Sequence, residues 1–129
     1  MPPVERTSSL TAVNLPDAEV YHLPGRDWSL LIGPQNTTAR NVTLGRAVFP
    51  AGSAPDGHIH PGEEEVIYIV SGSGELVTPD GTVKLAPGTA VYVPPGLHHS
   101  TVSSGPEPLE LLSIFSPPVM PGSYETGDR

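Results

Sequence analysis

Four residues of types that commonly bind metal ions lie in two short segments: His58, His60 and Glu65 in the first, and His99 in the second. The chain has five histidines, and four of them fall in these segments. Two residues apart on an extended strand, His58 and His60 project from the same face, roughly 6.5–7 Å apart along the backbone. A helix would instead require a spacing of three or four residues. The pattern therefore predicts a metal site built on β-strands.

The absence of cysteine restricts the chemistry of this site. Disulfides, thiolate ligands and thiol nucleophiles are excluded, so any metal must be held by histidine and carboxylate. Three neutral imidazoles and one carboxylate leave one or two open positions on a five- or six-coordinate ion, where a substrate can bind. We predict one divalent transition metal ion as the cofactor. Fe(II) is the first choice, and Mn, Ni, Cu and Zn suit the same ligands.

The elements that must position these ligands are expected to be β-strands. Seventeen prolines and fourteen glycines divide the 129 residues into short apolar stretches rich in Val, Ile, Leu and Tyr, which is typical of strands joined by turns. The expected strands cover residues 19–23, 27–32, 41–49, 65–71, 75–78, 82–85, 89–93, 99–103 and 109–115. Their recurrence at intervals of about 8–12 residues predicts an all-β sandwich or barrel.

Length and charge limit the organisation and the partners. We expect one domain, with an irregular N-terminal arm (1–18), a β-barrel (19–116) and a surface tail (117–129). The net charge of −8 and the absence of a Lys/Arg cluster argue against nucleic acid as a partner. The longest apolar run, Val66–Val70, is far too short to span a membrane, and no secretory signal is evident. We expect a cytoplasmic protein that does not bind membranes.

The two segments resemble the motifs of the cupin superfamily, which are small jelly-roll β-barrels. The first motif, a glycine, His-x-His, a glutamate and a second glycine at fixed spacings, is filled by Gly52, His58, His60, Glu65 and Gly72. The second motif is filled by Gly88, Pro94, Gly96 and His99. Ser103 stands where the family often has Asn. The resemblance implies a single-domain cupin β-barrel in which His58, His60, Glu65 and His99 bind one metal ion.

Other residues near these motifs have competing interpretations. Periodicity alone leaves Glu63, Glu64 and Glu65 open as the carboxylate ligand, and the step to Gly72 in the cupin motif selects Glu65. His98 is expected on the opposite face of its strand from His99. His22, outside both motifs, is expected to be structural or exposed.

No catalytic residue is assigned, and the candidates are weak. Arg46 could bind a substrate carboxylate. Tyr68, Tyr92 and Trp28 could supply a proton donor or a stacking surface, although aromatic residues in sheets usually serve packing. Ile67, Ile69, Val91, Val93 and either Leu112 or Ile114 are expected to form the apolar wall.

The cupin resemblance implies a metal-dependent enzyme acting on a small metal-chelating organic molecule, with an oxygenase (dioxygenase-like oxidoreductase) as the first expectation. Lyase, isomerase or decarboxylase chemistry, in which the ion acts as a Lewis acid, is the alternative. A non-catalytic module that binds a sugar or a small acid is another. The chain is also similar to small cupins that cleave dimethylsulfoniopropionate, but Ile67 occupies the position of their catalytic tyrosine. We expect a homodimer, formed through the sheet or the N-terminal arm.

Overall fold

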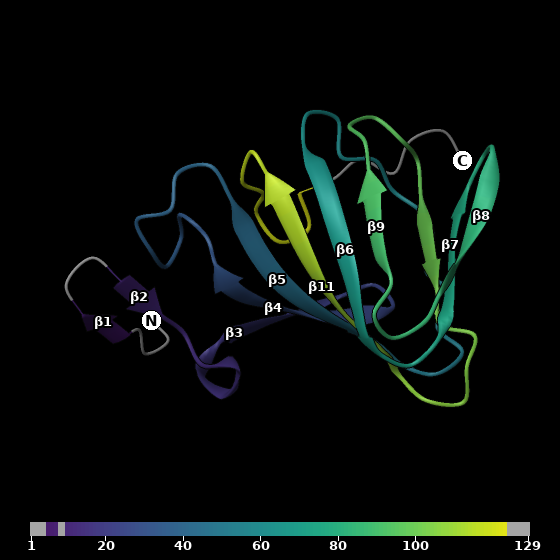
Figure 1. The fold of residues 1–129 in the computed structure, drawn as a ribbon, viewed down its shortest axis with the longest axis horizontal. Coiled ribbons are helices and arrows are strands. Elements are labelled where there is room, and N and C mark those ends of the chain that lie inside the picture. The colour runs from purple at the N-terminus through teal and green to yellow at the C-terminus, as the bar shows by residue number, and fades with distance from the viewer. Residues whose placement is uncertain (1–4, 8–9, 124–129) are drawn as a thin grey trace.

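The computed structural model describes residues 5–7 and 10–123 and is built almost entirely of β-strands, which confirms the predicted fold class. Six strands form the large sheet, in the order β3-β4-β5-β11-β6-β9. These are β3 (Glu19–Leu23), β4 (Arg26–Ile32), β5 (Thr43–Phe49), β11 (Leu109–Ser116), β6 (Glu64–Ser71) and β9 (Ala90–Val93). A smaller sheet, in the order β10-β7-β8, consists of β10 (Ser100–Val102), β7 (Gly74–Thr78) and β8 (Gly81–Leu85). Figure 1 shows the small sheet standing against one end of the large one.

The core lies on the inner face of the large sheet, because alternate side chains of each strand point inward. Across four neighbouring strands, the register aligns Trp28 with Ala47, Ala47 with Leu111, and Leu111 with Ile69. All four side chains are buried. Next to this row, a Cβ on Gly45 would collide with the indole ring of Trp28, so glycine makes room for this ring against β5.

On β11 the inward residues differ from the expectation. Leu111 and Phe115 are buried, whereas Ile114 is exposed and Leu112 is half-buried. Neither Leu112 nor Ile114 lines the cavity of the barrel. Of the wall residues expected on β6 and β9, Ile67 lines the cavity. Ile69 and Val93 are buried in the core and Val91 is half-buried, but these three do not line the cavity.

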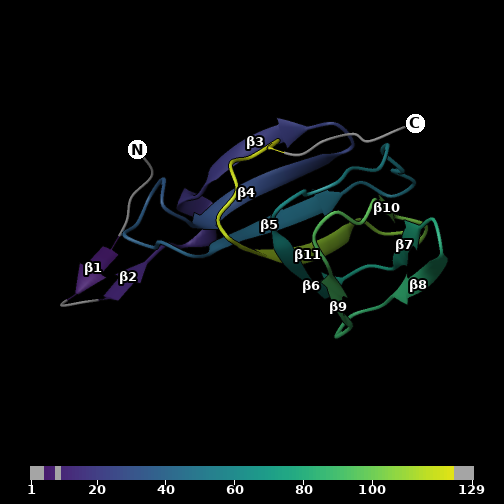
Figure 2. The ribbon, with the colours of Figure 1, turned by 90° about the horizontal axis from the view of Figure 1, so that it is seen from above.

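The two ends of the chain differ from the expectation. The arm expected to be irregular contains two short strands, β1 (Glu5–Thr7) and β2 (Leu10–Ala12), followed by a 3-10 turn, η1 (Leu15–Asp17). Figures 1 and 2 show the β1–β2 hairpin projecting away from the barrel. Residues 1–4 and 8–9 of the arm lie outside the described residues.

The tail, expected on the surface, instead returns across the barrel after β11 (Figure 2). Val119 is buried in the core. Its backbone nitrogen donates to Thr43 Oγ1 at 3.1 Å, and its carbonyl oxygen accepts from Gln35 Nε2 at 3.1 Å. We call residues 117–123 the C-terminal strap. Residues 124–129 lie outside the described residues. None of the described helical structure has the length and apolar character of a transmembrane helix.

Candidate metal centre

The two histidine segments are held side by side by backbone hydrogen bonds. His58 and His99 form a bridge in which each backbone nitrogen donates to the carbonyl oxygen of the other at 3.0 Å. The pairing continues at both ends, because Gly96 donates to the carbonyl of His60 at 2.9 Å and Gly52 donates to the carbonyl of Ser103 at 2.8 Å. Residues 52–60 therefore run beside residues 96–103, and side chains 39 or more positions apart in sequence reach one place.

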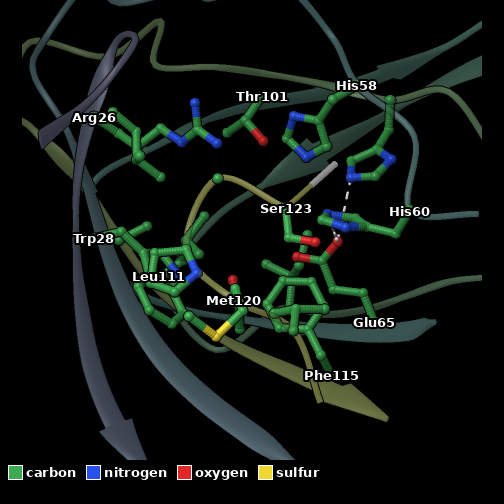
Figure 3. A pocket seen from close by; sticks show the side chains of 18 of the residues that line it. Arg26, Trp28, His58, His60, Glu65, Thr101, Leu111, Phe115, Met120 and Ser123 are labelled. Atoms are coloured by element: carbon green, nitrogen blue, oxygen red, sulfur yellow. Dashed lines mark ion pairs between the residues drawn. The ribbon is translucent and has the colours of Figure 1, made fainter. Parts of the chain in front are cut away.

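The three imidazoles converge. His58, His60 and His99 each offer a ring nitrogen, and these atoms all lie within 4.8 Å of one another. The ring centroid of His58 lies 4.8 Å from that of His60 and 4.6 Å from that of His99. His60 and His99 are buried, and His58 is half-buried. Figure 3 shows the rings of His58 and His60 at one side of the cavity.

Glu65, on β6, approaches this group from the large sheet. Its Oε1 lies 3.2 Å from His99 Nε2 and 3.7 Å from His60 Nε2. Both Glu65 Oε1 and His99 Nε2 are buried, yet neither has a hydrogen-bond partner of acceptable geometry among the described residues. Buried polar atoms normally have partners, so these two fit atoms that bind an ion. Glu63 and Glu64 are less buried, and Glu64 Oε1 accepts a 2.7 Å hydrogen bond from Tyr92.

The electrostatics favour neutral imidazoles at two of the three positions. Burial, assisted by the neighbouring His99 and His60, lowers the pKa of His58 from 6.5 to about 2. Burial also lowers the pKa of His60, against the opposing effect of Glu65. Burial acts to lower the pKa of His99 as well, but contact with the Glu65 carboxylate and with the Leu97 carbonyl outweighs it and raises that pKa. Neutral imidazole is the form that binds metals.

His99 is also oriented from its other side. Its Nδ1 lies 2.9 Å from the carbonyl oxygen of Leu97. A ring whose Nδ1 donates to a backbone carbonyl presents Nε2 as the lone-pair donor, which is the usual arrangement of a metal-binding histidine. The donor set, its convergence and this orientation fit a divalent transition metal ion, and the assignment of the four ligands stays a prediction.

The histidines and Glu65 form one side of a cavity inside the barrel. The space between the lining side chains, with the open solvent beside them included, is about 540 Å³. Much of the remaining wall is apolar, and it includes Trp28, Phe49, Ile67, Leu111 and Phe115. The strap residues 119–123 line it as well.

Three of the four weak candidates for catalysis, Arg46, Tyr68 and Tyr92, do not line this cavity. The side chain of Arg46 contacts Glu110, with its Nε 2.7 Å from Oε2. Tyr68 and Tyr92 are 45% and 55% exposed on the outer face of the large sheet. Alternation explains both positions, because the neighbours of inward residues on a strand point outward. Trp28 does line the cavity, as part of its apolar wall.

The other two histidines are outside the centre. His98 does not line the cavity and packs against Gly57, where a Cβ would collide with its ring. His22 is exposed, and its Nδ1 lies 2.7 Å from Asp27 Oδ1.

Sequence reasoning missed several lining residues: Arg26, Thr101, Met120 and Ser123. Thr101 could have been found, because it lies two positions after His99 on the same extended segment and therefore faces the same way. Arg26 and the strap carry no local signal, since they reach the cavity only through tertiary folding.

The sequence comparisons agree with this fold. A family model described as Cupin domain matches residues 45–115, and the chain belongs to the cupin family. It is 32% identical over 88 residues to the uncharacterized protein MJ1618 of Methanocaldococcus jannaschii. The alignment covers 68% of this chain and 70% of that protein. It is 41% identical over 66 residues to the glucose-6-phosphate isomerase of Thermococcus kodakarensis. The alignment covers 46% of this chain and 35% of the isomerase. The matched region thus spans about a third of that isomerase.

Solved structures show the same fold. The polyketide cyclase RemF from Streptomyces resistomycificus superimposes with a TM-score of 0.70 at 25% identity, covering 82% of this chain and 78% of the cyclase.

Proposed function

We propose that this cupin is a metal-dependent enzyme that converts a small, metal-chelating organic molecule inside the barrel. The observation that carries the proposal is the convergence of three imidazoles and a buried carboxylate on one side of a largely apolar cavity. A purely structural cluster would be expected to satisfy its buried polar atoms internally, whereas His99 Nε2 and Glu65 Oε1 lie 3.2 Å apart without acceptable hydrogen-bond geometry to any group in the described part of the chain.

His58, His60, His99 and Glu65 would hold the ion, for which Fe(II) is the first choice and Mn, Ni, Cu and Zn are the others. When bound, the ion would supply a Lewis acid and, if it is redox-active, access to oxygen chemistry. The apolar wall would hold the body of the substrate and exclude water. Glu65 is the one carboxylate among the described lining residues, so it is the group best placed to accept a proton from the substrate.

The reaction type proposed from the sequence is that of an oxygenase. Non-redox chemistry is the second candidate, favoured by the names of two similar proteins, an isomerase and a polyketide cyclase. Binding of a sugar or a small acid without turnover is the remaining alternative. The compartment proposed from the sequence is the cytoplasm.

Metal analysis of the purified protein tests the centre. We expect about one equivalent of a transition metal in the wild type and a sharp loss of metal in His99→Ala. The adjacent His98→Ala is the matched control and should keep the wild-type content, because His98 does not line the cavity. Equal losses in the two variants would contradict the assignment of His99.

Oxygen uptake by the metal-loaded protein, measured against β-diketones, catechols and flavonols, tests the reaction type. Uptake coupled to loss of substrate supports an oxygenase. Turnover without uptake supports the non-redox candidate, and binding without turnover of any compound supports the binding module. Each active compound should become inactive with His99→Ala.

A further inference from the structure

Two uncharged hydrogen-bond donors lie on the cavity wall: the indole N–H of Trp28 and the hydroxyl of Ser113. Both residues line the cavity, and they are buried, with 5% and 4% of their surface exposed. Neither polar atom makes a hydrogen bond to another residue that the structure describes, and neither is among the unpartnered atoms sealed off by the surrounding protein. Both atoms therefore face the cavity. Buried indole N–H groups and hydroxyls normally have a partner, and here the space for one lies inside the barrel.

Gly45 on β5 brings the two donors close together. It pairs with Ser113 of β11, and the edge of the Trp28 ring lies over it, with Nε1 2.6 Å from the position that a Cβ on this glycine would occupy. Cβ positions directly opposite each other in an antiparallel pair are about 5 Å apart. The indole nitrogen and the Ser113 side chain are therefore neighbours on one inner face of the sheet. A single ligand oxygen placed between them is within reach of both.

The register of the sheet also gives the separation of this donor pair from the candidate metal centre. Glu65 of β6 pairs with Phe115, and Ile67 pairs with Ser113. Ser113 is thus displaced from the strand position of Glu65 by two residues, which is roughly 6.5–7 Å. Figure 3 shows Trp28 across the cavity from Glu65. A molecule with one six-membered ring is long enough to reach from the centre to the donor pair.

We propose that the Trp28 indole N–H and the Ser113 hydroxyl together bind a neutral carbonyl oxygen of the substrate. This assignment rests on the proposed function, since the other end of the same molecule would chelate the metal. A carbonyl oxygen has two lone pairs and accepts from both donors. Two uncharged donors suit a neutral oxygen better than an anion, whose burial costs more. The substrate class is thereby narrowed to ring-sized carbonyl compounds with a chelating group at the opposite end.

Two catechols of nearly the same shape test the donor pair. 3,4-Dihydroxyacetophenone has a carbonyl oxygen where 4-isopropylcatechol has a methyl group. Calorimetric titration of Zn(II)-loaded protein gives the ratio of their affinities. Ser113→Ala and Trp28→Phe should each lower the preference for the ketone about fivefold or more, without changing the metal content. Comparing this ratio between proteins cancels the different affinities of the two catechols for zinc itself.

Ser29→Ala is the matched control, because Ser29 is a buried serine next to Trp28 that does not line the cavity. It should keep the wild-type ratio. A loss of preference in Ser29→Ala equal to that in Ser113→Ala would overturn the proposal, since it would show that any change in the packing of these strands has the same effect.

The single tryptophan of the chain gives a second measurement that needs no substitution. The one indole N–H signal of nitrogen-15-labelled protein reports Trp28 directly, and Zn(II), a d¹⁰ ion, leaves the spectrum undisturbed. Saturation with the ketone should move this signal downfield and slow its exchange with solvent, because the N–H gains an acceptor. Saturation with 4-isopropylcatechol should do neither. The proposal is overturned if neither catechol binds the metal-loaded wild type, if the signal responds equally to both, or if Ser113→Ala keeps the wild-type preference.

Failure of the metal centre gives a different result. If the wild type retains no metal, the proposed function fails. The donor pair is then tested in the metal-free protein with 4-hydroxyacetophenone and 4-isopropylphenol, which lack the chelating pair of hydroxyls. A downfield indole shift with the ketone alone would support the donor pair without the centre, and its absence would overturn the donor pair itself.

Discussion

At the scale of single residues, the burial that keeps His58 neutral also lowers the stability of the protein in acid. Burial holds the pKa of His58 near 2, against 6.5 in the unfolded chain. Between pH 2 and pH 6.5, His58 is therefore protonated in the unfolded chain but neutral in the folded protein. Stability from this residue is present above pH 6.5 and is lost as the pH falls. His99, whose pKa is raised, has the opposite sign and offsets part of the loss.

This difference predicts the acid sensitivity of the metal-free protein. Between pH 6.5 and 2, His58 should reduce the free energy of unfolding by up to about 1.4 kcal/mol per pH unit. Urea unfolding of chelator-treated protein at pH 7, 6 and 5 should show a steep fall for the wild type and a shallower one for His58→Asn. The exposed His22→Asn should follow the wild type. Parallel curves for His58→Asn and the wild type would contradict the assigned role of burial.

The residue pattern foretold part of this site. The convergence of His58 and His60 follows from their spacing on a strand, but their meeting with His99 rested on the cupin motifs, because no local rule pairs segments so far apart. The outward position of Tyr68 could have been deduced once Ile67 was placed inward. Arg26 could not, since its approach to the histidines depends on how the Pro24-Gly25 turn packs on Pro55.

At the scale of elements, the C-terminal strap joins β5 to the wall of the cavity. Thr43 is fully buried, and its Oγ1 accepts a 3.1 Å hydrogen bond from the backbone nitrogen of Val119. Residues 120–123, directly after this anchor, line the cavity. The anchor therefore fixes one wall of the cavity.

Replacing Thr43 by valine, which has nearly the same shape, tests the anchor. The buried backbone N–H of Val119 would lose its partner, which should lower the free energy of unfolding by about 1–3 kcal/mol. Thr78→Val is the matched control. Its hydroxyl bonds to Asp80 on an exposed hairpin, so the change should stay within about 0.5 kcal/mol. Urea unfolding measures both, and an equal effect of the two substitutions would show that the strap is not anchored through Thr43.

The strands themselves were predictable where prolines and glycines mark their ends. The strand expected at 19–23 matches β3, and the one expected at 41–49 contains β5 (Thr43–Phe49). The face of β11 was not predictable, because Leu111 and Leu112 are adjacent and equally apolar. The strap was misjudged because Pro117 and Pro118 are typical of a surface segment, whereas its hydrogen bonds lead to residues about 80 positions earlier.

At the scale of the whole molecule, the large sheet has two apolar faces. The inner face forms the core and the cavity. On the outer face, β6 exposes Val66, Tyr68 and Val70. Val66 pairs with Tyr92 on one side and with Ile114 on the other, and both of these side chains are exposed too. Exposed apolar side chains gathered in this way commonly mark an interaction surface.

We expect two copies of the chain to associate through this outer face as a symmetric dimer. Light scattering after gel filtration should then give twice the 13.5 kDa chain mass. Val66→Lys places a charge in the apolar face and should shift the protein toward the monomer. Val83→Lys is the matched control, because Val83 is exposed to a similar degree, 48% against 37%, but belongs to the small sheet. A monomeric wild type, or dissociation by Val83→Lys as well, would contradict this interface. If the dimer forms through this face, metal content should be the same in both variants, because the cavity lies on the opposite face of the sheet.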